Sequence, residues 1–455
     1  MQEEMRQENK MGVMPITKLI ITMSLPIMAS MLVQALYNIV DSIFVAQVSE
    51  NALTAVSMAF PIQNLMIAVA TGTGVGINAL LSRNLGAKDY ERVNKIAENA
   101  VFLGIISYIL FLVIGIFGSE AFFRSQTDIE EIIQHGTVYT RICCCFSIGV
   151  FVQIFFERML QSTGKTIYSM VTQGVGAIIN IILDPILIFG WFGFPAMGVA
   201  GAAYATVIGQ IAAGILAVVL NHKVNKEIKI HLKGFKPEFA IIKQIYSIGI
   251  PSIIMASIGS IMNYGMNRIL LGFTSTAAAV FGVYFKLQSF IFMPVFGLNN
   301  GVIPVIAYNY GAGKRSRVVK SIKTSAVIAV IIMAVGVLLF QTMPELLLGL
   351  FDASETMLHI GVPALRVISL SFLFAAIGIA CSSAFQALGY AVYSMIMSII
   401  RQLVVILPVA YFISLIGDVR LVWWAFPIAE TVAIIVCAFF MVHVYKTVIS
   451  KIGEK

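Results

Sequence analysis

Apolar stretches long enough to cross a membrane as helices recur along the whole chain. A helix needs roughly 20 mostly apolar residues to cross the hydrocarbon core of a bilayer. The sequence contains such stretches at residues 16–46, 53–82, 95–118, 131–157, 166–190, 197–221, 241–273, 277–308, 319–341, 356–386, 391–416 and 420–446. This pattern predicts an all-α integral membrane protein with twelve transmembrane helices.

The composition supports a membrane protein and argues against a soluble one. Of the 455 residues, 59% are hydrophobic and 11% are charged, and the mean hydropathy is +0.92. Soluble proteins average about 45–50% apolar and about 25% charged residues. The net charge of +8 does not indicate nucleic-acid binding, because the basic residues lie in short loops between apolar stretches. No phosphate loop, zinc signature or nucleophile elbow is present, so we expect neither an enzyme nor a cofactor.

Lysine and arginine predict the orientation of the chain in the membrane. Of the 30 basic residues, 23 lie near the termini and in loops 83–95, 158–165, 222–243 and 314–323. Loops on the cytoplasmic side of membrane proteins carry such an excess of positive charge. We therefore expect a multi-pass protein of the plasma membrane with both termini in the cytoplasm. The polar N-terminus has no apolar core, so we expect no cleavable signal peptide.

The second half of the chain repeats the first at a constant offset of 225 residues. The stretch "NLGA" at 84–87 matches "NYGA" at 309–312, and "QSTGKTIYSM" at 161–170 matches "QALGYAVYSM" at 386–395. The glycine pair Gly72 and Gly76 matches Gly297 and Gly301. One register kept over about 150 residues indicates an internal duplication.

The duplication predicts two six-helix lobes. Each half holds an even number of spans, so the halves should form a parallel repeat, an arrangement found in membrane carriers. The expected divisions are a cytoplasmic tail (1–15), an N-terminal lobe (16–221), a linker (222–240), a C-terminal lobe (241–446) and a second tail (447–455). We expect a monomer whose lobes face each other across a central cleft and work by alternating access.

Four acidic residues lie within the predicted spans: Asp41, Glu157, Asp184 and Glu430. An ionisable group inside a membrane is a candidate functional residue by default. The alternative is a structural carboxylate that pairs with an arginine or caps a broken helix. Because Glu157 adjoins Arg158 at a predicted helix end, we expect those two to form a solvated ion pair.

The stretch "NIILDPILIFGW" at 180–191 offers a set of oxygen ligands. Asn180 and Asp184 are four residues apart and therefore share one helix face. Pro185 has no N–H and clashes with the carbonyl of Ile181, which frees that oxygen from the helix. Tyr37 and Asp41 are also four residues apart. Hard oxygen donors of this kind bind small cations.

The duplicated half lacks this set of polar residues. At the offset of 225, Asp41 corresponds to Met266, and Asn180 and Asp184 correspond to Val405 and Val409. If the carboxylates couple transport to an ion, the coupling resides in the first half alone.

The sequence resembles transporters of the multidrug and toxic compound extrusion (MATE) family of the bacterial type. The resemblance rests on "LPIMASMLVQALYNIVDSIFV" at 25–45, "GVGINALLSRNLGAKD" at 74–89, "NIILDPILIFG" at 180–190 and "GVAGAAYATVIGQ" at 198–210. It implies twelve helices in two lobes and export of amphipathic, often cationic small molecules in exchange for inward Na⁺ or H⁺.

The resemblance also implies roles for particular residues. It assigns a cation or proton site, with Na⁺ as one possible occupant, to Asp41, Asn180, Asp184 and Thr206, with Tyr37 as a weaker member. Some members of the family carry acidic residues in the second lobe, where this chain has only Glu430. Span positions alone indicate residues that border the cleft: Met28, Gln34, Asn38, Gln63, Met66, Met255 and Asn263.

Several alternatives remain open from the sequence. A flippase for a lipid-linked saccharide commonly has fourteen spans and a more cationic cleft, and a channel usually surrounds its pore with several subunits. The basic residues Lys286 and Arg401 could pair with a helix-end carbonyl, pair with Glu430 or line the cleft. The sequence identifies neither the substrate nor the coupling ion.

Overall fold

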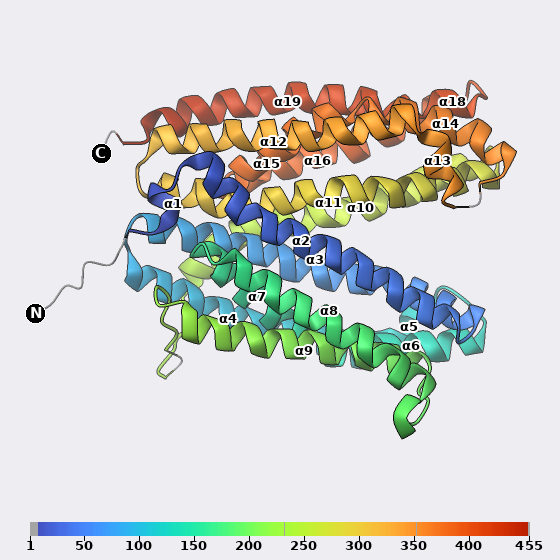
Figure 1. Cartoon of the computed structure of the whole chain (residues 1–455), viewed down its shortest axis with the longest axis horizontal. Coiled ribbons are helices and arrows are strands. Elements are labelled where there is room, and N and C mark those ends of the chain that lie inside the picture. The colour runs from blue at the N-terminus through green and yellow to red at the C-terminus, as the bar shows by residue number, and fades with distance from the viewer. Residues whose placement is uncertain (1–7, 232, 352, 454–455) are drawn as a thin grey trace, which may run out of the picture. The chain divides into compact units, whose positions relative to one another are not determined.

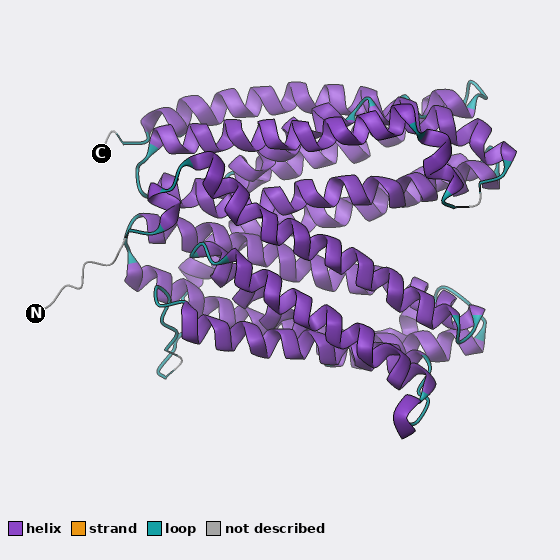
Figure 2. Ribbon diagram, viewed as in Figure 1, coloured by secondary structure: helices purple, strands orange, loops and turns teal. Residues whose placement is uncertain are grey.

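The computed structural model describes residues 8–231, 233–351 and 353–453, and its regular elements there are helices (Figures 1 and 2). In chain order the elements are α1 (Lys10–Val13), α2 (Ile16–Ala46), α3 (Glu50–Gly86), α4 (Tyr90–Val113), η1 (Ile114–Gly118), α5 (Ser119–Arg124), α6 (Glu130–Cys145), α7 (Ile148–Ser162), α8 (Thr166–Phe189), η2 (Trp191–Gly193), α9 (Val199–Val224), α10 (Phe239–Leu271), α11 (Ser275–Gly311), α12 (Arg315–Thr342), α13 (Pro344–Gly349), α14 (Glu355–Ser369), α15 (Phe372–Leu388), α16 (Ala391–Ile399), η3 (Ile400–Ile406), α17 (Leu407–Ser414), α18 (Val419–Val422), α19 (Ala425–Thr447) and η4 (Ile449–Lys451). Helices satisfy their own backbone hydrogen bonds, which an apolar membrane interior requires.

The predicted membrane spans are confirmed in number, with two corrections of shape. Within the described residues, ten helices are long and apolar enough to cross a membrane, and two bent helix pairs bring the total to as many as twelve. The predicted single spans 131–157 and 356–386 are each two helices, bent by 45° between α6 and α7 and by 47° between α14 and α15.

Both bends arise where the backbone leaves α-helical hydrogen bonding. The N–H of Ser147 bonds to the carbonyl of Cys144 at 3.2 Å, and that of Ser371 bonds to Ile368 at 3.0 Å. These bonds reach back three residues instead of four, which tightens the turn and ends an α-helix. The two breaks lie at equivalent places in the two halves, so the duplication preserved the bend.

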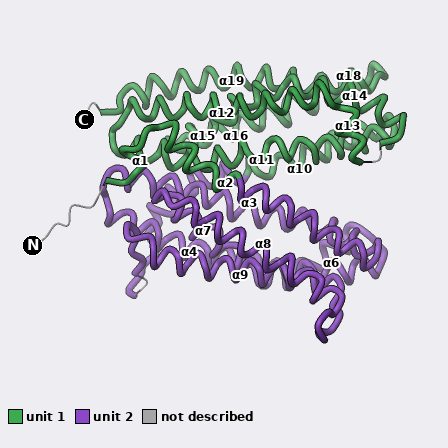
Figure 3. Tube along the Cα trace, in the orientation of Figure 1, with its two compact units in different colours: residues 1–28, 254–455 green, residues 29–253 purple. Residues whose placement is uncertain are grey.

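The chain forms two compact units, and their limits follow the duplication (Figure 3). Unit 1 contains residues 1–28 and 254–455, and unit 2 contains residues 29–253. The two boundaries are 225 residues apart, the offset of the repeat. These units differ from the predicted lobes 16–221 and 241–446, because the first part of α2 belongs to unit 1 and the first part of α10 belongs to unit 2.

Glycines allow these exchanged segments to pack closely within each unit. In unit 2, a Cβ on Gly76 would lie 2.3 Å from the backbone oxygen of Ile245 in α10. In unit 1, a Cβ on Gly301 would lie 2.7 Å from the Cα of Ser24 in α2. Small residues at such contacts let helix backbones approach in membrane proteins, where packing drives association. The repeated glycines are therefore packing residues in both units.

The segment predicted as a linker, 222–240, packs along α4 in unit 2. Backbone N–H groups of Lys229, His231 and Glu238 donate to the side chains of Asn94, Glu98 and Asn99 at 2.8–3.0 Å. These bonds tie the segment to one helix over most of its length.

We predict that Gly76→Ala lowers the stability of the protein, because the new methyl group would overlap the Ile245 carbonyl. Overpacking of this kind typically costs about 1–3 kcal/mol. The matched control is Gly174→Ala, since a Cβ there meets no atom within 4 Å. The measurement is the thermal unfolding midpoint of each purified variant in detergent; equal midpoints for the two variants would contradict the packing role.

Candidate cation site in unit 2

Asp184, Asn180 and Thr206 meet where α8 packs against α9. The Asn180 amide nitrogen lies 3.5 Å from Asp184 Oδ1 and 3.3 Å from Thr206 Oγ1. Asp184 is 0% exposed and Asn180 is 3% exposed. These three polar groups therefore meet at one largely buried point between the two helices.

Small residues position this contact. A Cβ on Gly209 of α9 would lie 2.7 Å from the carbonyl oxygen of Gly176, one turn before Asn180 in α8. A Cβ on Gly201 would lie 2.4 Å from the carbonyl of Leu187. The two helices can approach this closely because neither glycine carries a side chain. Thr206 lies between Gly201 and Gly209, so the same contact brings its hydroxyl to Asn180.

Helix α2 adds the second carboxylate. The Asp41 side chain lies within hydrogen-bonding reach of Asp184. Tyr37, one turn earlier on α2, lies near both carboxylates and within hydrogen-bonding reach of Gln34. The structure therefore brings together the five residues of the predicted cation site, contributed by α2, α8 and α9.

Three oxygens at this point have no hydrogen-bond donor: Asp41 Oδ1, Asn180 Oδ1 and Asp184 Oδ2. A buried acceptor left without a donor costs about 1–3 kcal/mol, so such groups are rare in folded proteins. Two carboxylates and a carbonyl oxygen are also the donors that a small hard cation prefers. Either a proton shared by the carboxylates or a bound cation gives these oxygens the partner that they lack.

A polar group from α3 and α6 lies beside the site, and the sequence indicated only Gln63 from it, as a residue that borders the cleft. Gln63 donates to the Tyr139 hydroxyl at 3.1 Å and approaches Cys143 Sγ at 3.8 Å. Both Tyr139 and Cys143 are buried close to Asp41. Tyr139 lies in α6, 76 residues after its hydrogen-bond partner Gln63, so only the tertiary structure identifies it.

The residues predicted to border a cleft divide between the units. Gln34, Asn38, Gln63 and Met66 belong to unit 2, and Met28, Met255 and Asn263 belong to unit 1. Met66 is 3% exposed and therefore packs in the interior of unit 2. Met255 accepts a hydrogen bond from Ser382 at 3.8 Å. Substrate contact by these residues remains a prediction.

Glu157 corrects an expectation from the sequence. It is 3% exposed rather than solvated, and its carboxylate accepts hydrogen bonds from Gln153, Thr172 and Gln173 at 2.8–3.2 Å. Arg158 donates instead to Gln161 at 2.8 Å. Adjacent residues on a helix point to different sides, so Glu157 and Arg158 have separate partners.

In unit 1 the charged residues Arg401 and Lys286 have partners of their own. Arg401 Nη1 lies 3.1 Å from Glu430 Oε1, which settles one of the open alternatives for Arg401. Lys286 Nζ lies 5.9 Å from the centre of the Phe351 ring. The positions that correspond to the cation site hold Met266, Val405 and Val409, and Met266 is fully buried.

Comparisons with known proteins agree with this architecture. The MatE family model matches residues 26–186 and again residues 251–412. Two relatives named multidrug export protein MepA match nearly the whole chain. The one from Staphylococcus haemolyticus (strain JCSC1435) is 29% identical over 432 residues, which cover 94% of this chain and 93% of the relative. The one from Staphylococcus saprophyticus (strain ATCC 15305) is 28% identical over 412 residues, which cover 90% of each protein.

Solved structures match the fold over the whole length of the chain. A multidrug resistance MATE family transporter of the MOP superfamily, solved in an outward-facing conformation, gives a TM-score of 0.90 at 26% identity over 100% of both chains. A MOP superfamily transporter from Pyrococcus furiosus, described as having a binding pocket of reverse polarity, gives a TM-score of 0.88 at 26% identity over 100% of both chains. Since the family model matches well over half of the sequence, once in each half, the chain belongs to the MatE family.

Proposed function

We propose that this protein is a multidrug exporter that exchanges amphipathic, often cationic compounds for inward Na⁺ or H⁺. The names of the matched relatives support multidrug export over the alternatives of a saccharide flippase or a channel. One observation above all supports coupling to a cation. Asp41 and Asp184 lie together, and one oxygen of each, like Asn180 Oδ1, has no hydrogen-bond donor. The protein is embedded in the cell membrane with both termini on the cytoplasmic side.

The carboxylate pair provides a physical reason for ion coupling. Two negative charges at short range in an apolar interior repel each other strongly and are poorly solvated. A proton or Na⁺ bound between them removes one charge and supplies the missing partner. The free energy of the site therefore depends on whether the ion is bound. Ion binding shifts the protein towards the conformation that binds the ion more tightly.

We expect Pro185 to let occupancy of the site change the bend of helix α8. This proline follows Asp184 directly and leaves the Ile181 carbonyl without a helical donor. Helix α8 nonetheless continues to Phe189. A helix with one missing hydrogen bond bends more easily, so occupancy of the site can change its shape and weaken substrate binding. Ion and drug then antagonise each other, which is what exchange across the membrane requires.

The coupling site belongs to one half of the chain only. In the other half, Arg401 neutralises Glu430 from within the protein, so that pair needs no external cation. Met266, Val405 and Val409 offer no oxygen ligands at the corresponding positions.

We predict that Asp184→Asn and Asp41→Asn each reduce concentrative export of a cationic dye at least about tenfold at equal membrane expression. The amide keeps the size of the side chain but cannot hold the charge that the cation neutralises. The measurement is ethidium efflux from cells or proteoliposomes under an imposed gradient of Na⁺ or of H⁺. The control is Glu91→Gln, an exposed carboxylate that pairs with Lys95. Export at the wild-type rate in both aspartate variants would refute the assignment.

We predict that Met266→Asp does not create a second coupling site. An unpaired carboxylate in a membrane span costs roughly 2.5–3.5 kcal/mol on insertion scales. Because Met266 is fully buried and lacks polar counterparts, the expected result is lower expression with no increase in ions moved per substrate. Met266→Leu, which conserves volume, serves as the control and should express normally. A higher ion-to-substrate ratio in the aspartate variant would show that one carboxylate suffices.

A further inference from the structure

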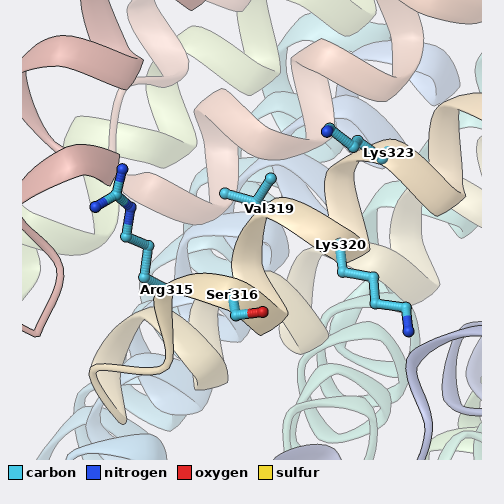
Figure 4. A pocket seen from close by; sticks show the side chains of 5 residues that line it. All are labelled: Arg315, Ser316, Val319, Lys320 and Lys323. Carbon is cyan, nitrogen blue, oxygen red and sulfur yellow. The ribbon is translucent and has the colours of Figure 1, made fainter.

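A pocket at the start of α12 is lined by cationic side chains. Arg315, Ser316, Val319, Lys320 and Lys323 surround a volume of about 440 Å³, and their side chains spread from successive turns of the helix (Figure 4). Arg315 is held in place by Tyr445, whose hydroxyl accepts a hydrogen bond at 3.2 Å and whose ring lies 5.8 Å from the guanidinium. We call Arg315, Ser316, Lys320 and Lys323 the basic pocket.

The charge of the basic pocket is not neutralised by the protein. None of the described carboxylates forms an ion pair with Arg315, Lys320 or Lys323, and the sequence has no acidic residue between 312 and 344. The neighbouring cations are already engaged: Lys314 pairs with Glu8, and Arg317 donates to Asn309, Met11 and Met14. Three positive charges are therefore available to an anion from outside.

The duplicated helix shows that the fold does not require this charge. At the offset of 225, Ser316, Lys320 and Lys323 correspond to Glu91, Lys95 and Glu98 on α4. There, Lys95 pairs with Glu91 at 3.2 Å and with Glu238 at 3.4 Å, while Glu98 accepts the N–H of His231. Acidic side chains thus neutralise the positive charge on α4, whereas no described acidic side chain does so at the corresponding positions of α12.

An apolar stripe continues from the basic pocket along the same face of α12. Ser316, Lys320 and Lys323 are followed at helical spacing by Val327, Ile331, Val335 and Leu338, which are 55–61% exposed. The twelve helical steps from Lys323 to Val335 extend roughly 18 Å at 1.5 Å per residue. This length is comparable with half of the ~30 Å hydrocarbon core of a bilayer. The face thus presents cations at one end and an acyl-chain-sized apolar surface beyond them.

We propose that this face binds one anionic phospholipid, with the headgroup phosphate in the basic pocket and an acyl chain along the apolar stripe. Basic pockets on the cytoplasmic side of membrane proteins recognise anionic headgroups, and the positive-inside rule places this end of α12 on that side. A free phosphate would use the cations alone, whereas a lipid also uses the stripe. The inference concerns lipid binding and does not depend on the proposed drug export.

The test measures lipid binding to the purified, delipidated full chain by native mass spectrometry. The probes are dioleoyl phosphatidylglycerol, which is anionic, and dioleoyl phosphatidylethanolamine, which is zwitterionic. We expect the wild type to bind the anionic lipid about tenfold more tightly, and Lys320→Gln with Lys323→Gln to remove about tenfold of that affinity. Lys223→Gln with Lys243→Gln, two exposed lysines outside the pocket, should leave it unchanged.

A second variant makes the test independent of any one lysine. Ser316→Glu with Lys323→Glu copies the pattern of α4 onto α12 and should abolish the preference for phosphatidylglycerol, with an unchanged thermal unfolding midpoint because both side chains are exposed. Equal affinity of the wild type for the two lipids would overturn the proposal. Displacement of the lipid by millimolar inorganic phosphate would also overturn it, because the pocket would then be a site for free phosphate.

Discussion

Asp41 and Asp184 cannot both carry a negative charge in their apolar surroundings without a partner, and the polar contacts around these two carboxylates depend on this constraint. Gly176 and Gly209 bring α8 and α9 together so that Asn180 and Thr206 lie beside the carboxylates. The three oxygens without donors define a place where positive charge is favourable. A titratable or cation-binding site in a membrane interior is expensive, which is why such sites are generally functional.

The two halves of the chain show how one scaffold supports different chemistry. At the offset of 225, Gly176 corresponds to Arg401, so the second half has a guanidinium where the first half has a close helix contact. Arg401 lies in the π-helical segment η3 and pairs with Glu430. Glycine contacts, helix caps at Ser49 and Thr274, and both helix bends persist in the two halves. Backbone geometry was therefore retained while buried charge diverged.

Hydropathy and internal repetition were sufficient to predict the helices, because membrane spans must be long, apolar and regular. The bends after Cys145 and Ser369 could not be predicted, since neither break contains a proline. The acidic residues within spans indicated Asp41 and Asp184, the spacing of Asn180 and Asp184 indicated one helix face, and the resemblance joined these residues and Thr206 into one site. Tyr139 depends on a contact with Gln63, which is distant in sequence, and the burial of Glu157 depends on hydrogen bonds between α7 and α8; no local pattern records either contact.

We propose that the carboxylates of Asp41 and Asp184 link ion binding to drug binding. The most direct measurement is the affinity of a fluorescent cationic drug for the purified protein in detergent, with Na⁺ varied at fixed pH and with pH varied in the absence of Na⁺. We expect Na⁺ or H⁺ to weaken drug binding at least roughly fivefold, the lower range of coupling between sites, and Asp184→Asn to bind drug independently of the ion. A wild-type affinity that neither cation changes would contradict it.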